Sequence, residues 1–188
     1  MVAYVKENFF LVLTTVLLLF LVSSSNGNFS MMITENEIDT ICAKKFLNSS
    51  LCYELLKSTP KIATLDFYGL TKFLINYDYR NVSDAMNQIK LSAGNATDLQ
   101  TIDLCVRLYE NTLHDTGLIF EALAAENYVR VVDYIFRLIG DVSACQEELL
   151  IMKPRLEDSI TRNNVVMNIS SIIAYILECY LVKDKTKC

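Results

Sequence analysis

The scarcity of proline is the feature of this sequence that most restricts its fold. The chain has two prolines, Pro60 and Pro154, and five glycines among its 188 residues. Long stretches without these helix breakers, rich in Leu, Ile, Ala and Glu, favour helices over strands. The sequence also lacks the extended alternation typical of a sheet, and it has no internal repeat. It therefore predicts an all-α fold.

Four apolar-periodic stretches are predicted to be long helices. They cover about residues 63–93, a stretch that opens at the capping-box pattern Thr97-x-x-Gln100, and about residues 127–150 and 158–181. The second is the most regular, because its apolar side recurs at alternating spacings of three and four. The recurring positions are Ile102, Cys105, Tyr109, Thr112, Thr116, Ile119 and Leu123. Four such stretches joined by short links are typical of an up-down-up-down four-helix bundle.

Three expectations concern details of these helices. Gly140 and Asp141 predict a break or kink near the middle of the third helix. The buried side of the first helix is expected to contain Leu70, Phe73, Leu74, Tyr77, Met86 and Ile89. The inward side of the fourth is expected to contain Val165, Ile169, Ile172, Ile173, Ile176 and Cys179.

Two short helical segments precede the four long ones. The capping-box pattern Thr34-x-x-Glu37 opens the first, and the second covers about residues 51–56 and ends at Ser58-Thr59-Pro60. A Cys42–Cys52 bridge would hold the two segments as a hairpin and would contribute about 3 kcal/mol in the chain-entropy model. A Cys105–Cys145 bridge would join the second and third bundle helices if both cysteines face the seam, and would contribute about 4 kcal/mol.

The N-terminal segment predicts secretion. Lys6 precedes an uncharged apolar run, residues 9–22, which ends in the small residues Ser23-Ser24-Ser25. This order is typical of a signal peptide, and the run is shorter than the ~20 residues that a membrane-spanning helix needs. A membrane anchor is the alternative interpretation. We therefore expect a signal peptide at residues 1–27 and one domain at residues 28–188, with no membrane association after cleavage.

Secretion affects how the cysteines and asparagines are interpreted. In an oxidising compartment the six cysteines tend to form disulfides. The formal net charge of −5 argues against nucleic acid or an anionic lipid surface as partner and suits a basic protein partner. Five Asn-x-Ser/Thr sequons are the candidates for glycosylation: Asn28, Asn48, Asn81, Asn95 and Asn168.

The residue patterns that enzymes need are scarce. His114 is the one histidine in the sequence, which also lacks a CxxC motif and a Gly-rich phosphate loop. Glu147 and Glu148 are adjacent, so on a helix their side chains point in different directions. We interpret His114 as a surface or core residue and the two glutamates as part of a solvated helix face. The sequence therefore predicts no catalytic, cofactor or metal site, and a protein that is not an enzyme.

The cysteines in their helical context resemble the plant invertase/pectin methylesterase inhibitor family. The segments that carry the resemblance are Ile41-Cys42-Ala43-Lys44, residues 51–58, residues 103–110 with Glu121-Ala122-Leu123, and residues 140–148. Together they span about residues 33–181. The resemblance implies a short hairpin closed by Cys42–Cys52, ahead of a four-helix bundle closed by Cys105–Cys145.

The last two cysteines are less well defined by the resemblance. A cysteine late in the last helix, like Cys179, is familiar in the family and is usually unpaired. Cys188 departs from the family pattern. It could bridge to Cys179, cross-link two chains or stay free.

The resemblance also implies a function. The protein is expected to be secreted to the cell wall, ahead of the vacuole, and to block a pectin methylesterase or an acid invertase in a one-to-one complex without any cofactor. Invertase-type inhibitors carry a Pro-Lys-Phe motif early in the third bundle helix. The corresponding positions here are Tyr128, Val129 and Arg130, of which Arg130 alone keeps the basic character.

Two alternatives remain open at this point. A methylesterase inhibitor is implied to use the exposed faces of the first two bundle helices instead. From a different class, a secreted helical bundle could act in signalling or ligand binding without inhibiting an enzyme. An exposed partner face on a packed bundle would favour the inhibitor, and a hollow apolar interior would favour the ligand-binding protein.

Overall fold

The structure is a computed structural model that describes residues 32–92, 99–151, 157–183, 186 and 188. Residues 32–188 form one compact unit. The expected signal peptide, residues 1–27, lies outside the described residues, as do Thr97 of the second capping box and the sequons at Asn28 and Asn95.

A helical hairpin forms the start of the described chain. It consists of α2 (Glu35–Cys42) and α3 (Ser49–Lys57), followed by a 3₁₀ turn, η1 (Pro60–Thr64). The capping box that opens α2 is present as predicted, because Glu37 N donates to Thr34 Oγ1 and Thr34 N donates to Glu37 Oε2. Asn48 caps α3 by accepting a hydrogen bond from Leu51 N.

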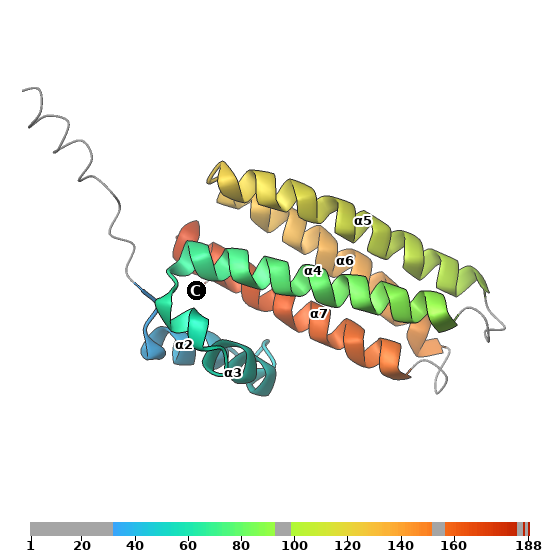
Figure 1. Cartoon of the computed structure of the whole chain (residues 1–188), viewed down its shortest axis with the longest axis horizontal. Coiled ribbons are helices and arrows are strands. Elements are labelled where there is room, and N and C mark those ends of the chain that lie inside the picture. Colours follow the sequence, from blue (N-terminus) through green and yellow to red (C-terminus); the bar gives the residue numbers. More distant parts are fainter. Residues whose placement is uncertain (1–31, 93–98, 152–156, 184–185, 187) are drawn as a thin grey trace, which may run out of the picture. The chain divides into compact units, whose positions relative to one another are not determined.

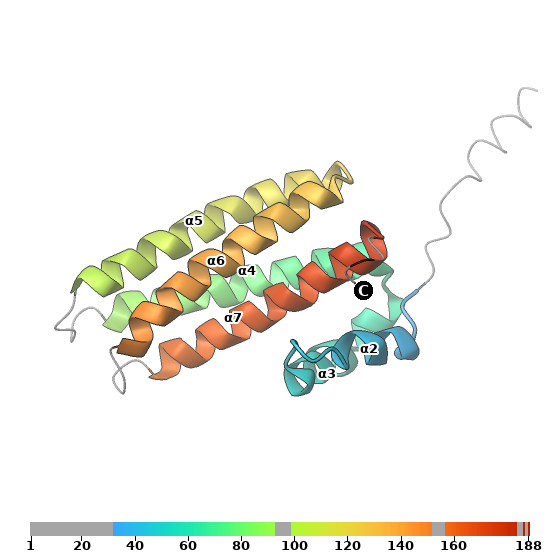
Figure 2. The same ribbon diagram turned by 180° about the vertical axis from the view of Figure 1, so that it is seen from behind.

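Four long helices make the bundle: α4 (Phe67–Ser92), α5 (Leu99–Ala124), α6 (Tyr128–Ile151) and α7 (Glu157–Ile176). Each packs against its two neighbours in the order α4, α5, α6, α7 and back to α4 (Figures 1 and 2). This is the predicted up-down-up-down bundle with an N-terminal hairpin. The two expected disulfides are present, Cys42–Cys52 in the hairpin and Cys105–Cys145 between α5 and α6.

One of the detailed expectations is wrong, and another is confirmed only in part. Helix α6 runs unbroken through Gly140, because Leu138 and Val142 on either side of it are buried in the core and hold the helix despite the low helix propensity of glycine. In α4, Tyr77 was expected on the buried side but is 38% exposed, and the core also contains Asp78 and Val82, which were not singled out. The other expected positions hold, since Leu70, Leu74 and Ile89 are buried, and Phe73 and Met86 are half-buried against the core.

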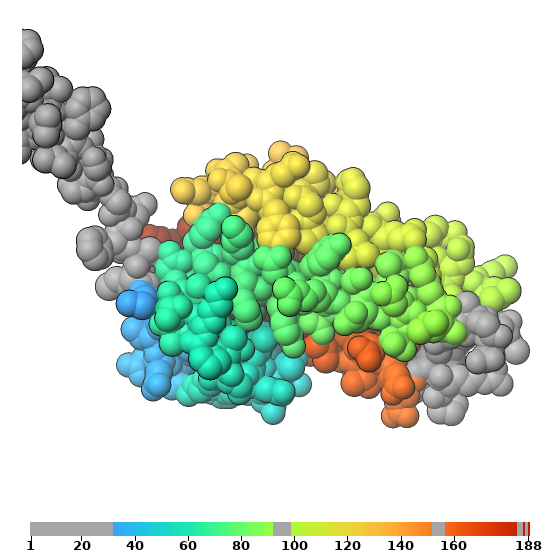
Figure 3. Space-filling model, in the orientation of Figure 1, coloured from blue at the N-terminus to red at the C-terminus, as the bar shows by residue number. Residues whose placement is uncertain are grey.

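Helix α7 is buried on nearly all sides towards its end. Every residue from Ile172 to Ile176 is buried, because α4 and α6 cover one side and the hairpin covers the other. In Figure 3 the hairpin, blue to teal, lies beside the first half of α4, whereas the orange start of α7 remains at the surface. By length and composition alone, the segment 157–181 could span a membrane. A helix that is buried on nearly all sides inside a protein has the same apolar character.

A third disulfide, Cys179–Cys188, closes the C-terminus. Cys179 follows α7 in a turn of π-helix, η3 (Leu177–Leu181). The carbonyl oxygen of Cys188 accepts a hydrogen bond from Lys44 Nζ at 2.9 Å, so the chain end meets the hairpin. Of the three alternatives left open by the sequence, the structure has the bridge between these two cysteines.

Two apolar clusters fill the bundle. The hairpin-end cluster joins the buried residues of the hairpin and η1 to Leu70, Leu74 and Ile75 of α4, Ile119, Ala122 and Leu123 of α5, Val131, Val132, Tyr134 and Ile135 of α6, and residues 169 and 172–177. The far-end cluster is Val82, Ala85, Ile89, Ile102, Cys105, Tyr109, Leu138, Val142, Cys145, Leu149, Ile160 and Val166.

A group of buried polar side chains lies where the two clusters meet. Along α4, Asp78 lies between Ile75 of one cluster and Val82 of the other, and along α5 Thr112 lies between Tyr109 and Ile119. We call Asp78, Tyr109, Thr112, Asn163 and Ser170 the polar layer of the bundle.

Candidate functional site

The corner between α5 and α6 holds the three positions that the family resemblance singled out. Helix α5 ends at Ala124, and two residues later Glu126 is left-handed, with a φ of 54°. Asn127 N donates to Ala122 O and Glu126 N donates to Leu123 O, which is the hydrogen-bond pattern of a Schellman cap. Asn127 then caps α6, because its Oδ1 accepts from Arg130 N. Two caps in succession give the corner a defined backbone.

Tyr128 and Val129 form the apolar part of this corner. Tyr128 is half-buried and packs against the hairpin-end cluster, whereas Val129 is 60% exposed. Burial raises the pKa of the Tyr128 phenol above its usual value, and the nearby Glu126 carboxylate raises it further. Tyr128 therefore stays a neutral hydrogen-bonding group throughout the range in which carboxylates titrate.

Arg130 is exposed but held in place by one aromatic ring. Its Nε donates to the hydroxyl of Tyr134 at 3.1 Å, and its guanidinium carbon lies 5.6 Å from the centre of that ring. Tyr134 is 7% exposed, so it is a fixed support. Within the described residues no carboxylate forms an ion pair with Arg130. A guanidinium bound at Nε keeps its two outer NH₂ groups available, which is the geometry for a bidentate carboxylate contact.

Tyr134 also supports a second arginine, which belongs to an ion pair. The guanidinium carbon of Arg137 lies 4.4 Å from the Tyr134 ring centre, and Arg137 Nη2 lies 3.2 Å from Asp115 Oδ2. Asp141 lies close to this pair, and its pKa is raised by burial and by the Asp115 charge, against the lowering effect of Arg137. Arg137 is thus partly neutralised within the chain, and Arg130 is the cation of the corner that remains open to a partner.

The sequence located this corner but missed its support. Tyr128, Val129 and Arg130 were expected at the start of the third bundle helix, and they lie in the first turn of α6. Neither Tyr134 nor Arg137 was singled out. The signal was present, because Tyr134 follows Arg130 by four positions and precedes Arg137 by three, and residues at these spacings are neighbours on a helix.

Three of the five candidate sequons lie among the described residues. Asn48 is exposed, and its side-chain hydrogen bond uses Oδ1. Asn81 Nδ2 donates to Tyr77 O, and Asn168 Nδ2 donates to Asn164 O, so both amide nitrogens are engaged within their helices. The hydroxyl of the third sequon, Ser170, is buried and donates to Asp78. In the folded protein, Asn48 is thus the most accessible acceptor of the three.

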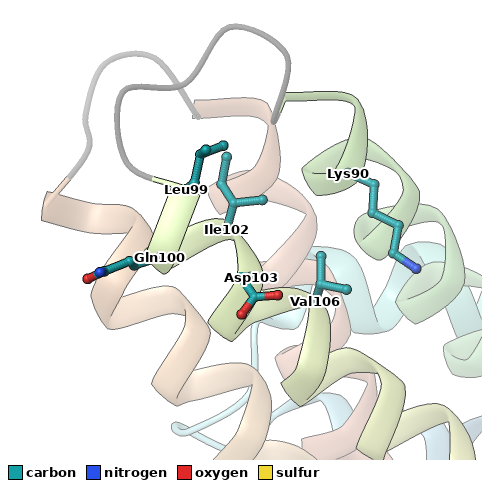
Figure 4. Close-up of a pocket in the computed structure, with 6 residues that line it drawn as sticks. All are labelled: Lys90, Leu99, Gln100, Ile102, Asp103 and Val106. Atoms are coloured by element: carbon teal, nitrogen blue, oxygen red, sulfur yellow. The ribbon is translucent and has the colours of Figure 1, made fainter.

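An open groove lies at the opposite end of the bundle. It has a volume of about 520 Å³ between the end of α4 and the start of α5, and it is lined by Lys90, Leu99, Gln100, Ile102, Asp103 and Val106 (Figure 4). Its charges are already engaged, since Lys90 Nζ lies 3.1 Å from Glu110 Oε1 and Asp103 pairs with Arg107. Among the described residues, no three His, Cys, Asp or Glu side chains come together as metal ligands. The two charged side chains that line the groove therefore already have partners within the chain.

Comparisons with known proteins extend over most of the chain. Residues 36–176 match the model of a family described as plant invertase/pectin methylesterase inhibitor. A crystal structure of mutant form A of a pectin methylesterase inhibitor from Arabidopsis is 18% identical, with a TM-score of 0.69, over 76% of this chain and 95% of that one. A crystal structure of a pectin methylesterase inhibitor from Arabidopsis thaliana, also 18% identical, has a TM-score of 0.58 over 78% and 97%. At this identity the two structures show a shared fold. The search among curated proteins returned no match.

Proposed function

Because the chain belongs to the plant invertase/pectin methylesterase inhibitor family, we propose that it is a secreted inhibitor that binds and blocks a pectin methylesterase. The match of residues 36–176 to the family is the observation that carries this proposal. An acid invertase, the other target in the family's description, is the second candidate target. The inhibitor acts through surface contacts in a one-to-one complex and needs no cofactor.

The corner between α5 and α6 is proposed as part of the contact surface. Val129 offers an exposed apolar side chain, and Arg130 offers a guanidinium that Tyr134 already holds in place. An arginine whose rotamer is fixed before binding loses less conformational entropy on association than a free one. Arginine and aromatic residues also dominate the binding energy of many interfaces. The chemistry of Arg130 suits a partner surface that carries a carboxylate.

The target is identified by parallel capture and inhibition. The disulfide-intact mature protein is immobilised and incubated with plant cell-wall and vacuolar extracts at mildly acidic pH, and methylesterase and invertase activities are measured in the unbound fraction. We expect methylesterase activity to fall and the methylesterase to be recovered on the support. Loss of invertase activity alone would reassign the target. If neither enzyme is retained, the inhibitor function is wrong, and the signalling or ligand-binding alternative gains support.

The contact surface is tested by substitution at Arg130. Arg130→Ala is expected to weaken binding of the captured enzyme about tenfold or more, since an anchored interface arginine typically contributes more than 1 kcal/mol. Arg162→Ala, which removes an exposed arginine from α7 at the other end of the bundle, is the matched control. Equal affinities for the two variants, measured by surface plasmon resonance, would place the interface elsewhere, and the exposed faces of α4 and α5 would be examined next.

Secretion and glycosylation are proposed on the sequence pattern. The signal peptide is expected to end near residue 27, and N-terminal sequencing of the secreted protein locates the cleavage. Among the sequons in the described residues, Asn48 is proposed as the glycosylated one because its amide nitrogen is not used within a helix. Peptide mapping after glycosidase treatment in ¹⁸O-labelled water identifies the asparagines that carry glycans.

A further inference from the structure

A carboxylic acid lies in the centre of the bundle, where neither the family match nor the proposed interface gives it a role. Asp78 of α4 is 2% exposed. Its Oδ2 accepts a hydrogen bond from Ser170 Oγ of α7 at 2.6 Å. Its Oδ1 has no hydrogen-bond partner among the described residues. A carboxylate accepts several hydrogen bonds when it is stably ionised inside a protein, and this one has a single neutral donor.

The elements that pack against α4 offer Asp78 no positive charge. These elements are α5, α7 and η3. The titratable group that faces Asp78 from α5 is Tyr109, which donates its hydroxyl hydrogen to Asn163 Oδ1 of α7. From α7 the facing side chain is Ser170, which is uncharged. From η3, the Tyr180 ring stacks on Phe67 at the start of α4, eleven residues before Asp78, and the other titratable group of this turn, Glu178, is an acid and brings no positive charge.

Burial of a charge without a counter-ion is costly, so the carboxyl gains from remaining protonated. Desolvation raises the pKa of Asp78 to about 8, against the lowering effect of the Ser170 hydrogen bond. Burial and then the proximity of Asp78 raise the pKa of Tyr109 as well, so the phenol stays neutral over the same range. The whole polar layer is therefore uncharged in acid, and Asp78 is the member that ionises first as the pH rises.

We propose that Asp78 is a pH-sensitive element of the fold: the bundle assembles around its neutral acid form, and ionisation of this carboxyl towards neutral pH loosens the junction between the hairpin-end and far-end clusters. The proposal does not depend on the identity of the target. It predicts that the stabilisation by this carboxyl is greatest in acid and is lost as the pH approaches neutrality.

The direction of the pH dependence of stability follows from proton binding in the folded and unfolded states. An aspartate in the unfolded chain ionises near pH 4, whereas Asp78 in the folded chain retains its proton to about pH 8. Between these values the folded state binds one more proton than the unfolded state, so the free energy of unfolding falls as the pH rises. The stabilisation by the neutral acid is complete below about pH 4 and is lost progressively through pH 8.

The test is the pH dependence of urea unfolding for the full disulfide-bonded protein and for Asp78→Asn, which keeps the shape of the side chain and cannot ionise. Between about pH 5 and 7, the unfolding equilibrium constant of the wild-type protein is expected to rise about tenfold per pH unit relative to that of Asp78→Asn. Asp84→Asn, which removes an exposed carboxyl from the same helix, should keep the wild-type slope. Parallel slopes for wild type and Asp78→Asn would overturn the proposal.

A direct titration of the wild-type carboxyl groups tests the proposal even if Asp78→Asn does not fold. The side-chain carboxyl carbons of the wild-type protein are labelled with ¹³C at aspartate and followed by NMR from pH 3 to 8. One buried aspartate resonance is expected to retain the chemical shift of a protonated acid beyond pH 6. Titration of every aspartate below pH 5 would show that Asp78 is charged in the folded bundle, and the proposal would fail.

Discussion

The two ends of this bundle are held together by different means. The hairpin-end cluster collects residues from the hairpin, from η1 and from all four long helices, and two disulfides and several ring contacts adjoin it. The far-end cluster contains residues of the four long helices alone, with one disulfide, Cys105–Cys145, inside it. One end is thus stabilised by a second layer of structure, and the other by a covalent bond between neighbouring helices.

The difference explains why the helices differ in how clearly the sequence reveals them. Helix α5 packs on one side alone, so its apolar stripe is regular and its predicted buried positions, from Ile102 to Leu123, are buried in the structure. Helix α7 is covered by the bundle on one side and by the hairpin on the other, so its end has no polar face. Where the apolar stripe of a helix widens until all sides of the helix are apolar, the sequence therefore indicates that a second layer of structure covers it.

The largest expected effect comes from removing the far-end disulfide. Cys105→Ala combined with Cys145→Ala is expected to lower the free energy of unfolding by about 4 kcal/mol, because the bridge closes a loop of 40 positions in the unfolded chain. Cys42→Ala combined with Cys52→Ala, which opens a loop of 10 positions, is expected to cost about 3 kcal/mol. Urea unfolding of both double variants measures the difference.

Hydrogen exchange tests whether the two ends depend on their disulfides to different degrees. In the variant without Cys105–Cys145, amides of the far-end segments of α5 and α6 should lose protection before those around Ile119 and Ile135. A uniform loss of protection over both clusters would contradict the comparison, since it would mean that the two ends unfold as one unit.

The sequence predicted the fold class, the hairpin and the bundle because each depends on local patterns and on cysteine spacing. It misplaced part of the buried side of α4, because Asp78 and Thr71 are buried there while Tyr77 is 38% exposed, which reverses the usual preference of polar and aromatic side chains. A count of apolar residues cannot detect such a reversal. The buried partners of Asp78 lie on α5 and α7, and their proximity depends on the register between helices that are distant in sequence.

The position of the candidate site, like the fold class, was predicted from the sequence, whereas its side-chain geometry was not. Its position at the start of the third bundle helix came from counting back from Cys145, and the structure places Tyr128, Val129 and Arg130 in that first turn. The exposure of Val129 and the fixed rotamer of Arg130 did not follow from the sequence, because they depend on the left-handed residue Glu126 and on the buried ring of Tyr134.

An intermediate effect is expected at the cap of the hairpin's second helix. Asn48→Ala removes the acceptor for Leu51 N and is expected to lower the free energy of unfolding by about 1 kcal/mol. Two control variants, measured in unglycosylated protein, separate the effect of the cap from that of the sequon. Asn48→Asp keeps a capping oxygen and should be nearly neutral, and Ser50→Ala removes the sequon while it leaves the cap intact. Equal losses for Asn48→Ala and Asn48→Asp in thermal unfolding would show that the cap does not stabilise the hairpin.

The smallest expected effect lies at the corner between α5 and α6, where the hairpin-end cluster meets the candidate site. Glu126 occupies a left-handed conformation. This conformation is unfavourable for a residue with a Cβ atom, and it costs glycine little free energy. Glu126→Gly is therefore expected to raise the free energy of unfolding by about 0.5 kcal/mol, the strain relief being partly offset by the greater entropy of glycine in the unfolded chain. The same substitution five residues earlier, Glu121→Gly, lies inside α5 and should destabilise by about 1 kcal/mol. Opposite signs for the two glycine variants would establish that the corner is a strained cap, and destabilisation by both would show that Glu126 has a favourable contact that outweighs its strain.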